Sequence, residues 1–425
     1  MQIRKSIILA TLMAMSLLSP SSAANRIYSD DIRSLQVMVD DNWLSPAVVS
    51  LDEMASGKKA VNISFDEMSH EYRRLIYHVE RCEPDWKPST ELFESDWLSG
   101  FNDNPIDDFT NSINTTFLYT NYRLQLPNDR CQLKMSGNYR VKVYDEDNPD
   151  DILLQADFMV VDNTARLYLS ATTNTDIDVN KCHQQVSMKL DYGSLNVSNP
   201  QEQLITIVKQ NNSDDNMRWN VAPNMTTTNG LVWQHNRQLI FDGGNEYHKF
   251  EVLDLSHPTM GIDRISWNGT AFNVYPFTSE PRQNYSYDEG AKGSFCIRNS
   301  EYSESDYTCD YAWIHYTLHT GARIGDIMID GWWTTDNERK KYMMEYDDAD
   351  ASYHLTLLQK QGHYSYRFVS VKPDGSTGTA ESEGNFHETA NTYQAYTYYH
   401  PTGGRSWMLA AYGELSFFSP ESSRH

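Results

Sequence analysis

The sequence has 425 residues, with 58 acidic side chains against 35 Lys and Arg, and its formal net charge at pH 7 is −23. A surface of this sign repels nucleic acids and anionic lipid headgroups, so neither is expected as a partner. The length is enough for roughly two to four domains of ~100–200 residues each.

The N-terminal segment, residues 1–24, has the pattern of a secretory signal peptide. Arg4 and Lys5 precede an apolar run, Ser6–Leu18, and small residues lead up to Ala24. The run is shorter than the ~20 apolar residues that span a bilayer, no Cys follows it to carry a lipid, and no later segment is apolar enough to span. We therefore expect cleavage near Ala24 and a soluble exported chain.

Residues 25–161 alternate apolar and polar side chains over short runs that are separated by turn residues. This is the pattern of β-strands with one buried face. The expected strands are 33–39, 60–65, 72–79, 117–126, 139–144 and 153–161. About seven short strands in a block of this size predict an immunoglobulin-like sandwich.

One connection in this block is unusually long. Within Glu71–Asn128, about three dozen residues separate two expected strands, whereas connections in compact domains have a median of ~4–6 residues. The segment is rich in Trp, Phe, Asp, Asn and Pro and has no period of its own. Long ordered connections are more often functional, so this segment is the first candidate for a binding role.

Two further blocks repeat the β pattern. The expected strands are 165–169, 185–192, 204–210, 231–233, 239–241, 247–255, 262–267 and 272–275 in the second block, and 311–318, 326–333, 342–346, 352–358, 364–368, 392–399 and 406–418 in the third. Helical periodicity is nearly absent. The chain is predicted to be all-β, with three consecutive immunoglobulin-like or early-set sandwich domains at 25–161, 162–303 and 304–425.

The cysteines are too few and too scattered for a disulfide scaffold. In an oxidising compartment, Cys82 can pair with Cys131 and Cys296 with Cys309, which leaves Cys182 without a partner. The sequence leaves the paired and the free states of these thiols open.

Two groups of acidic residues are candidates for ion sites: Asp347, Asp348 and Asp350, and Asp103, Asp107 and Asp108. The first group lacks the spacing and the final Glu of a calcium loop, since Ca²⁺ takes six to eight oxygen ligands. A solvated hairpin turn is favoured for it. The second group is compatible with a cation site or a catalytic carboxylate pair, but turn capping is favoured in a chain so rich in acids.

No other residue pattern indicates catalysis or a bound cofactor. His315 and His319 share a strand without a third ligand nearby in the sequence. Gly243 and Gly244 lack the strand-to-helix context of a phosphate loop and indicate a turn. No Gly-x-Ser-x-Gly motif or Cys/His pairing supports a nucleophile. We therefore predict a non-enzymatic chain with no metal, no cofactor and no catalytic residue.

The aromatic content, with 10 Trp and 27 Tyr, exceeds what small β cores need. Neighbouring strand residues face opposite ways, so only one of Trp332 and Trp333 can be buried in a one-sided sheet. An exposed aromatic indicates domain packing, a partner or stacking on sugar. The aromatics that stand out are Trp86, Trp97, Phe101, Trp332, Trp333, Tyr393, Tyr396, Tyr398 and Tyr399.

Motifs along nearly the whole mature chain match one family pattern. The segments are Cys82–Ser89, Trp97–Phe101, Ile106–Thr115, Tyr119–Asn128, Ser136–Tyr139, Lys209–Asn216, Phe241–Tyr247, Leu358–Tyr366 and Gly384–Tyr393. Together they resemble the type IX secretion system plug protein family of the Bacteroidetes, and the first-block motifs are the most specific.

The resemblance implies a periplasmic, non-enzymatic component of this secretion system that is associated with the outer membrane through its partner. The partner would be the outer-membrane translocon β-barrel, whose periplasmic mouth the protein closes when no cargo is exported. The residues assigned to partner binding are Trp86, Trp97, Phe101, Asp107, Asp108, Trp332 and Trp333.

Two alternatives stay open from the sequence. The Gly331-Trp332-Trp333 segment and the Tyr-rich strand 392–399 are also similar to glycogen-binding modules, which would make the chain a periplasmic or surface glycan-binding protein. That function requires the aromatic rings to form an exposed flat platform. A glycoside hydrolase, the weaker alternative, requires two carboxylates ~5–9.5 Å apart in a cleft.

Overall fold

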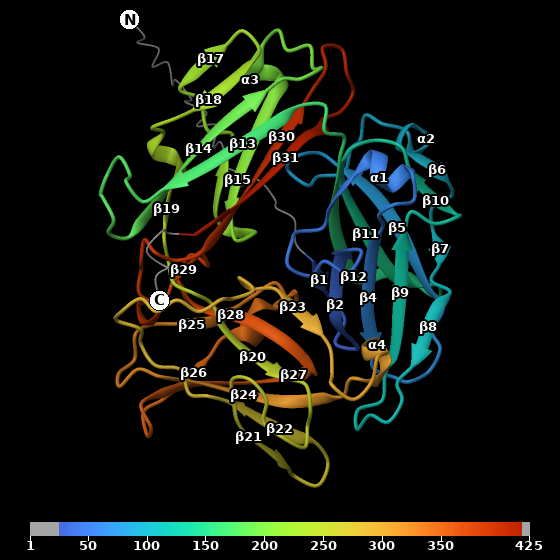
Figure 1. Ribbon diagram of the computed structural model, residues 1–425. Helices are drawn as coiled ribbons and strands as arrows, with labels where there is room; N and C mark the ends of the chain where they lie inside the picture. Colours follow the sequence, from blue (N-terminus) through green and yellow to red (C-terminus); the bar gives the residue numbers. More distant parts are fainter. Residues whose placement is uncertain (1–24, 419–425) are drawn as a thin grey trace, which may run out of the picture.

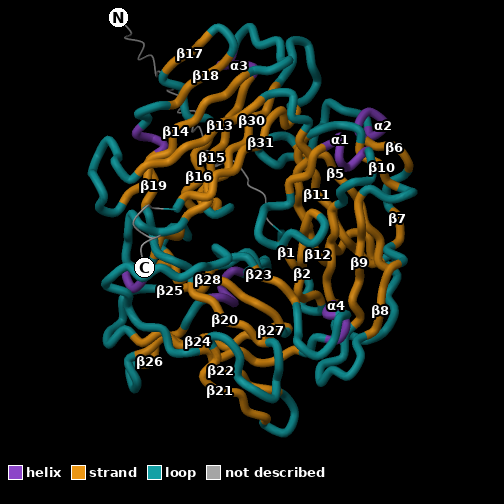
Figure 2. Tube along the Cα trace, in the orientation of Figure 1, coloured by secondary structure: helices purple, strands orange, loops and turns teal. Residues whose placement is uncertain are grey.

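The computed structural model describes residues 25–418, so the expected signal peptide lies outside the described residues. Of the structure, 49% is strand and 7% is helix, which confirms the predicted all-β class. The strands gather in three bodies around a common centre (Figure 1), and loops and a few single-turn helices connect them (Figure 2). The number of immunoglobulin-like domains stays a prediction.

The first body consists of two main sheets and a short extra pair of strands. One sheet has the order β1-β12-β11-β5-β7, with β3 parallel to β12, and the other has the order β2-β4-β9-β8. The strands are β1 (Arg26–Ile27), β2 (Ile32–Val39), β3 (Val48–Ser50), β4 (Val61–Glu67), β5 (Leu75–Cys82), β6 (Leu98–Gly100), β7 (Asn104–Pro105), β8 (Asp108–Asn111), β9 (Thr120–Leu126), β10 (Cys131–Leu133), β11 (Gly137–Asp145) and β12 (Asn148–Val161), and the helices are α1 (Leu51–Ala55) and α2 (Glu94–Trp97).

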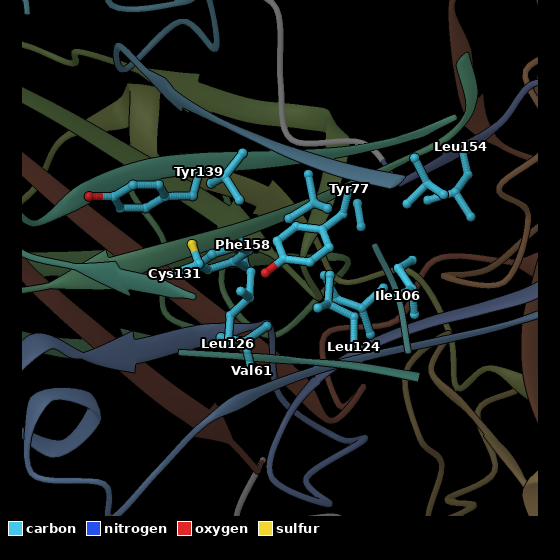
Figure 3. Packing of buried hydrophobic residues seen from close by; sticks show 14 of the residues in the cluster. Val61, Tyr77, Ile106, Leu124, Leu126, Cys131, Tyr139, Leu154 and Phe158 are labelled. Atoms are coloured by element: carbon cyan, nitrogen blue, oxygen red, sulfur yellow. The ribbon is translucent and has the colours of Figure 1, made fainter. Parts of the chain in front are cut away.

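The core of the first body lies between these two sheets. Tyr77 on β5, Leu124 on β9 and Phe158 on β12 all belong to it (Figure 3). Along β5 and β9 these side chains alternate with residues on the other face of the sheet, as the period of two in the sequence predicted. Strand β12 is buried on both faces from Leu153 to Val161, since Met159 and Val161 face the second body.

The second body pairs strands from two distant parts of the chain. One sheet has the order β13-β14-β18-β17, with β19 also on β14, and the other has the order β16-β15-β30-β31. The elements are β13 (Arg166–Thr172), β14 (His183–Asp191), α3 (Pro200–Gln203), β15 (Leu204–Gln210), β16 (Ser213–Trp219), β17 (Met225–Thr227), β18 (Gly230–Trp233), η1 (Arg237–Leu239), β19 (Ile240–Asp242), β30 (Asn391–Tyr399) and β31 (Met408–Phe417).

The third body contains the chain between β19 and β30. One sheet is built around β28, which pairs with β20, β23, β25 and β29, and the other has the order β21-β22-β24-β27-β26. The elements are β20 (His248–Val252), β21 (Ile262–Trp267), β22 (Phe272–Pro276), β23 (Phe295–Ile297), α4 (Ser305–Thr308), β24 (Tyr311–His319), β25 (Ile327–Asp330), η2 (Arg339–Tyr342), β26 (Glu345–Asp347), β27 (Ser352–Lys360), β28 (Gly362–Val371), β29 (Thr377–Thr379) and η3 (Glu381–Glu383).

The predicted boundary between residues 303 and 304 does not coincide with a boundary between sheets. Strand β30 pairs with β15, with Leu204 opposite Tyr399, so the C-terminal strands complete the second body. Strands β20 and β23 pair with β28, so residues before 304 complete the third body. The third body is therefore an insertion in the second. The predicted boundary fails because the backbone hydrogen bonds of these ladders join strands from before and after it.

Strand β30 explains part of the aromatic excess. Every residue of Asn391–Tyr399 is buried. Tyr393 and Tyr399 point into the core of the second body, while Tyr396 and Tyr398 lie in the apolar cluster between the second and first bodies. The Tyr398 hydroxyl donates to Asn138 Oδ1 of the first body at 2.7 Å. A central strand with two buried faces takes large side chains on both.

All five cysteines are free thiols. Cys131 lies in the core of the first body, whereas Cys82 lies in the cluster that faces the second body. The two thiols are therefore on different sides of the β5 sheet, and the pairing that the sequence left open between them is not formed. Cys296 and Cys309 are likewise unpaired.

Candidate docking surface

The long connection of the first body is ordered and runs along its outer side. It contains α2, β6, β7 and β8. Figure 1 shows β6, β7 and β8 on the side of the first body away from the second, whereas α2 contacts the second body through the ion pair of Asp96 with Arg405 at 2.8 Å. The segment lacked a period in the sequence because each of its strands has only two to four residues. Strand β8 is the edge of its sheet, so one side of its backbone has no partner strand within the described residues.

Trp86 is buried between the first and second bodies rather than offered to a partner. Its side chain is 5% exposed and packs in the cluster that contains Tyr396 and Tyr398. The Arg140 guanidinium lies 5.8 Å from its ring centroid. The backbone φ of Trp86 is +61°, a left-handed conformation that bulky residues rarely adopt. The tight turn places the ring in this interface.

Trp97 and Phe101 flank the short strand β6 and have opposite surroundings. Trp97 is 6% exposed and packs against Tyr139 in the core, with ring centroids 5.8 Å apart. Phe101 is 78% exposed. Between them, Gly100 has φ +113°, and a Cβ there would lie 2.0 Å from the carbonyl oxygen of Arg130. Trp97 therefore anchors the segment, and Phe101 projects from it.

The three Asp residues of this segment do not converge on one point. Asp107 pairs with Arg130 at 2.7 Å, and Asp108 pairs with Arg123 at 2.8 Å. Asp103 accepts hydrogen bonds from His78 and from the Tyr144 hydroxyl. The hydrogen bond to Asp108 raises the pKa of Arg123. These carboxylates are held in separate contacts, two of them ion pairs with arginines, instead of serving as the predicted turn caps.

Exposed apolar side chains follow the same segment, and we call this set the outer edge. Phe109 on β8 contacts Tyr72, with ring centroids 4.6 Å apart. Phe109 and Tyr72 were not among the residues predicted to bind a partner, although both lie within Glu71–Asn128. The outer edge consists of Tyr72, Phe101, Phe109, Ile113 and Leu118, which are 39–78% exposed.

Trp332 and Trp333 lie in the turn after β25 and do not form a platform. Trp333 is 8% exposed and donates from Nε1 to the carbonyl oxygen of Ser365 at 2.9 Å. Trp332 is half-buried and donates from Nε1 to the carbonyl oxygen of Asn211 in the second body at 3.3 Å. The predicted strand 326–333 is too long, since β25 ends at Asp330. Strand alternation is therefore not the reason why Trp333 is buried while Trp332 is only half-buried.

The three bodies enclose a polar cleft of about 330 Å³ where they meet. Its lining includes Trp43 from the first body, Lys209 from the second and Trp332 from the third. The charged residues that line the cleft include two arginines, Arg26 and Arg339, and carboxylates such as Asp330. The cleft is a junction between bodies, and its walls carry both signs of charge.

One group of side chains in residues 25–418 has the chemistry of a metal-binding set. Asp178, Cys182 and His183 come together on the second body, with ligand atoms within 4.8 Å of one another. The sequence predicted no metal, because its histidines show none of the His-rich ligand spacings. The signal that could have found the group is the Asp-x-x-x-Cys-His run at 178–183.

No helix within residues 25–418 is long and apolar enough to cross a membrane.

The fold and the outer edge define a multi-body β protein with an exposed apolar rim on its first body. The family model described as type 9 secretion system plug protein 1st domain matches residues 32–162, which contain the outer edge. Residues 32–162 thus form a first domain of the type 9 secretion system plug protein family. This family implies a location in the cell envelope and an association with this secretion machinery.

Among solved structures, a hypothetical protein from Parabacteroides merdae is similar to this chain over almost its whole length. Its identity is 35% and its TM-score 0.88, over 93% of this chain and 99% of that one. An enterococcal surface protein fragment aligns at 7% identity and TM-score 0.19, over 93% and 96% of the two chains, which is too weak to carry an argument. No curated protein matches the chain.

Proposed function

We propose that the protein is a non-enzymatic periplasmic plug that binds the periplasmic mouth of the outer-membrane translocon β-barrel and closes it. The family match of residues 32–162 is the observation that carries the proposal. The proposal also takes each of the three bodies to be an immunoglobulin-like or early-set sandwich, and the chain to reach the periplasm through a cleaved signal peptide at residues 1–24.

A plug has to resist deformation when it fills a wide pore, and the contacts between the bodies support this requirement. Lys360 of the third body pairs with Asp66 of the first at 2.6 Å, with both side chains buried. Arg367 of the third body pairs with Asp215 of the second at 2.8 Å. Tyr398 of the second body bonds to the first. Each body is thus fixed to the other two.

The outer edge is the docking surface that we assign to the first body. Phe101, the most exposed large apolar side chain of residues 25–418, lies on the connection that sets this segment apart in the sequence. Tyr72 and Phe109, with ring centroids 4.6 Å apart, add a pair of exposed rings on the same segment, and exposed apolar groups that gather in this way mark interaction sites. Asp107 and Asp108, each paired with an arginine, add polar groups to the same segment. Trp97 anchors the segment in the core of the first body, whereas Trp86 lies between the first and second bodies and Trp333 lies in the core of the third, so neither is assigned to the docking surface.

The test is recovery of the barrel with a tagged chain from detergent-solubilised outer membranes of the native host, followed by mass spectrometry. We expect one very large β-barrel protein to co-purify with the wild-type chain. Phe101→Ala should lower this recovery at unchanged melting temperature, and Phe277→Ala is the matched control, since Phe277 is 61% exposed on another body. Recovery of no outer-membrane protein would refute the proposal, and equal recovery with both variants would refute the assigned surface.

The glycan-binding alternative loses its structural basis at the residues that suggested it. Trp333 and all four tyrosines of β30 that stood out in the sequence are buried, and Trp332 is directed at the second body. A sugar ring stacks only on an exposed aromatic face. Retention of the chain on a polysaccharide column, together with no recovery of a barrel, would restore this alternative.

A further inference from the structure

We infer that Asp178, Cys182 and His183 form a binding site for a zinc ion on the second body, a function separate from docking. The three residues precede or begin β14, next to the end of β19. Their side chains are half-buried, so an ion can reach them from solvent. A thiol, an imidazole and a carboxylate are the three ligand types that Zn²⁺ takes in proteins.

The distances between the ligand atoms fit a tetrahedral ion. Cys182 Sγ lies 3.3 Å from His183 Nδ1 and 3.6 Å from Asp178 Oδ2. With Zn–S bonds of ~2.3 Å and Zn–N or Zn–O bonds of ~2.0–2.1 Å, tetrahedral ligands are separated by about 3.3–3.6 Å. His183 Nδ1 and Asp178 Oδ2 are now joined by a hydrogen bond of 2.6 Å. That pair has to open by about 0.7 Å when the metal takes the place of the proton.

The other nitrogen of the imidazole has the partner that a metal-binding histidine needs. His183 Nε2 lies 3.4 Å from Asp242 Oδ1. Strand pairing sets this approach, because His183 and Asp242 are opposite each other in the β14–β19 ladder. In metal sites the second ring N–H is almost always held by a carboxylate, a carbonyl or water, which fixes the tautomer and raises ligand basicity. Asp242 takes this role.

The carboxylate ligand is also held in place before any ion arrives. The Thr175 hydroxyl donates to Asp178 Oδ1 at 2.9 Å, which leaves Oδ2 directed at Cys182 and His183. The carbonyl of Cys182 accepts from the Gly243 backbone N–H at 2.8 Å, which fixes the residue that carries the thiol. The fourth position of a tetrahedral ion is left to water. Zinc binding releases the thiol proton of Cys182 to the buffer and breaks its S–H bond as the S–Zn bond forms, with no change of oxidation state. The proton displaced from between His183 Nδ1 and Asp178 is balanced by one taken up on Nε2, beside Asp242, so the imidazole stays neutral.

Binding is tested on a tag-free chain that begins at residue 25 and has been stripped with a chelator. Calorimetric titration with ZnCl₂ should show one equivalent bound. Titration with Co²⁺ should give the near-ultraviolet thiolate-to-cobalt absorption band. Cys182→Ser should abolish the band, whereas Cys296→Ser, which removes another half-buried free thiol, should leave it unchanged. Equal melting temperatures of the stripped proteins show that the variants are folded.

Two results of these titrations would overturn the inference of a zinc site. Zinc binding that is absent or non-stoichiometric in the wild-type chain, or that survives Cys182→Ser, rules out the site. Asp242→Asn should weaken zinc binding by about 10–100-fold, the usual effect of removing such a histidine partner. An unchanged affinity in this variant would overturn the role of Asp242. None of these results depends on binding to a barrel.

Discussion

The buried ion pair between the first and third bodies gives the sharpest stability prediction. Lys360 Nζ contacts Asp66 Oδ2 at 2.6 Å and lies 4.1 Å from the ring centroid of Tyr119. Asp66 also accepts from Asn121 at 2.8 Å and from the Tyr311 hydroxyl at 2.6 Å. Lys360→Met removes the cation and leaves the carboxylate buried with neutral donors. We expect a loss of about 3–5 kcal/mol in the free energy of unfolding, the usual result of removing one partner of a buried pair.

The pH dependence of this loss has a definite sign. Burial raises the pKa of Asp66 above its ordinary value even with Lys360 in place. Removing Lys360 raises it further, so the folded variant takes up a proton at a higher pH than the unfolded chain does. The destabilisation is therefore greatest at neutral pH and becomes smaller as the pH falls toward ~3.9, the ordinary Asp value.

The assay is urea unfolding at several pH values, followed by tryptophan fluorescence. The double variant Asp66→Asn/Lys360→Met removes both charges and should recover more than half of the loss. Lys340→Met is the control, since Lys340 is 78% exposed in its pair with Glu338 and an exposed pair contributes ~0–1 kcal/mol. The reasoning is refuted if Lys360→Met matches this control, or if the double variant is no more stable than Lys360→Met alone.

Two further predictions concern the interface of the first and second bodies and a buried histidine. Trp86→Ala should lower the free energy of unfolding by about 3–5 kcal/mol. The loss for Trp86→Gly should be about 1 kcal/mol smaller, because Gly adopts the left-handed φ of +61° without strain. Equal melting temperatures of the two variants would contradict this account of the turn. Burial lowers the pKa of His248 from 6.5 to about 3. Between these pH values the unfolded chain binds a proton that the folded chain does not, so the stability of the fold should fall as the pH is lowered from 6.5 to 3. His248→Gln should flatten this part of a profile of melting temperature against pH. An unchanged slope in the variant would contradict the role of His248.

The sequence predicted most strands because their signal is local. The alternation along 311–318 and 352–358 is visible without knowledge of the partner strand, and both became long strands, β24 and β27. Strand pairing is not local. Nothing near Leu204 in the sequence shows that Tyr399 lies opposite it, so the insertion of the third body was not predicted.

The burial of single side chains in the candidate surface also depends on strand pairing, so the sequence could not predict it. The sequence singled out the connection that carries Phe101, but it could not separate this exposed ring from Trp97, which lies four residues earlier and is buried. Burial depends on the sheet that the short strand β6 joins. The zinc-type group itself lies within residues 178–183, and its Asp-x-x-x-Cys-His run was visible in the sequence. The approach of Asp242 to His183 was not visible there, because it comes from the β14–β19 ladder.

The closing of the translocon barrel is the central claim, and ion conductance through the barrel tests it most directly. The barrel would be purified from a strain that lacks this protein and inserted into a planar bilayer in known orientation. We predict a large conductance that falls when the purified chain is added to the periplasmic side and does not change when it is added to the other side. Phe101→Ala should require a higher concentration for the same block than Phe277→Ala. An open barrel whose conductance is unaffected by saturating wild-type chain on the periplasmic side would contradict the account.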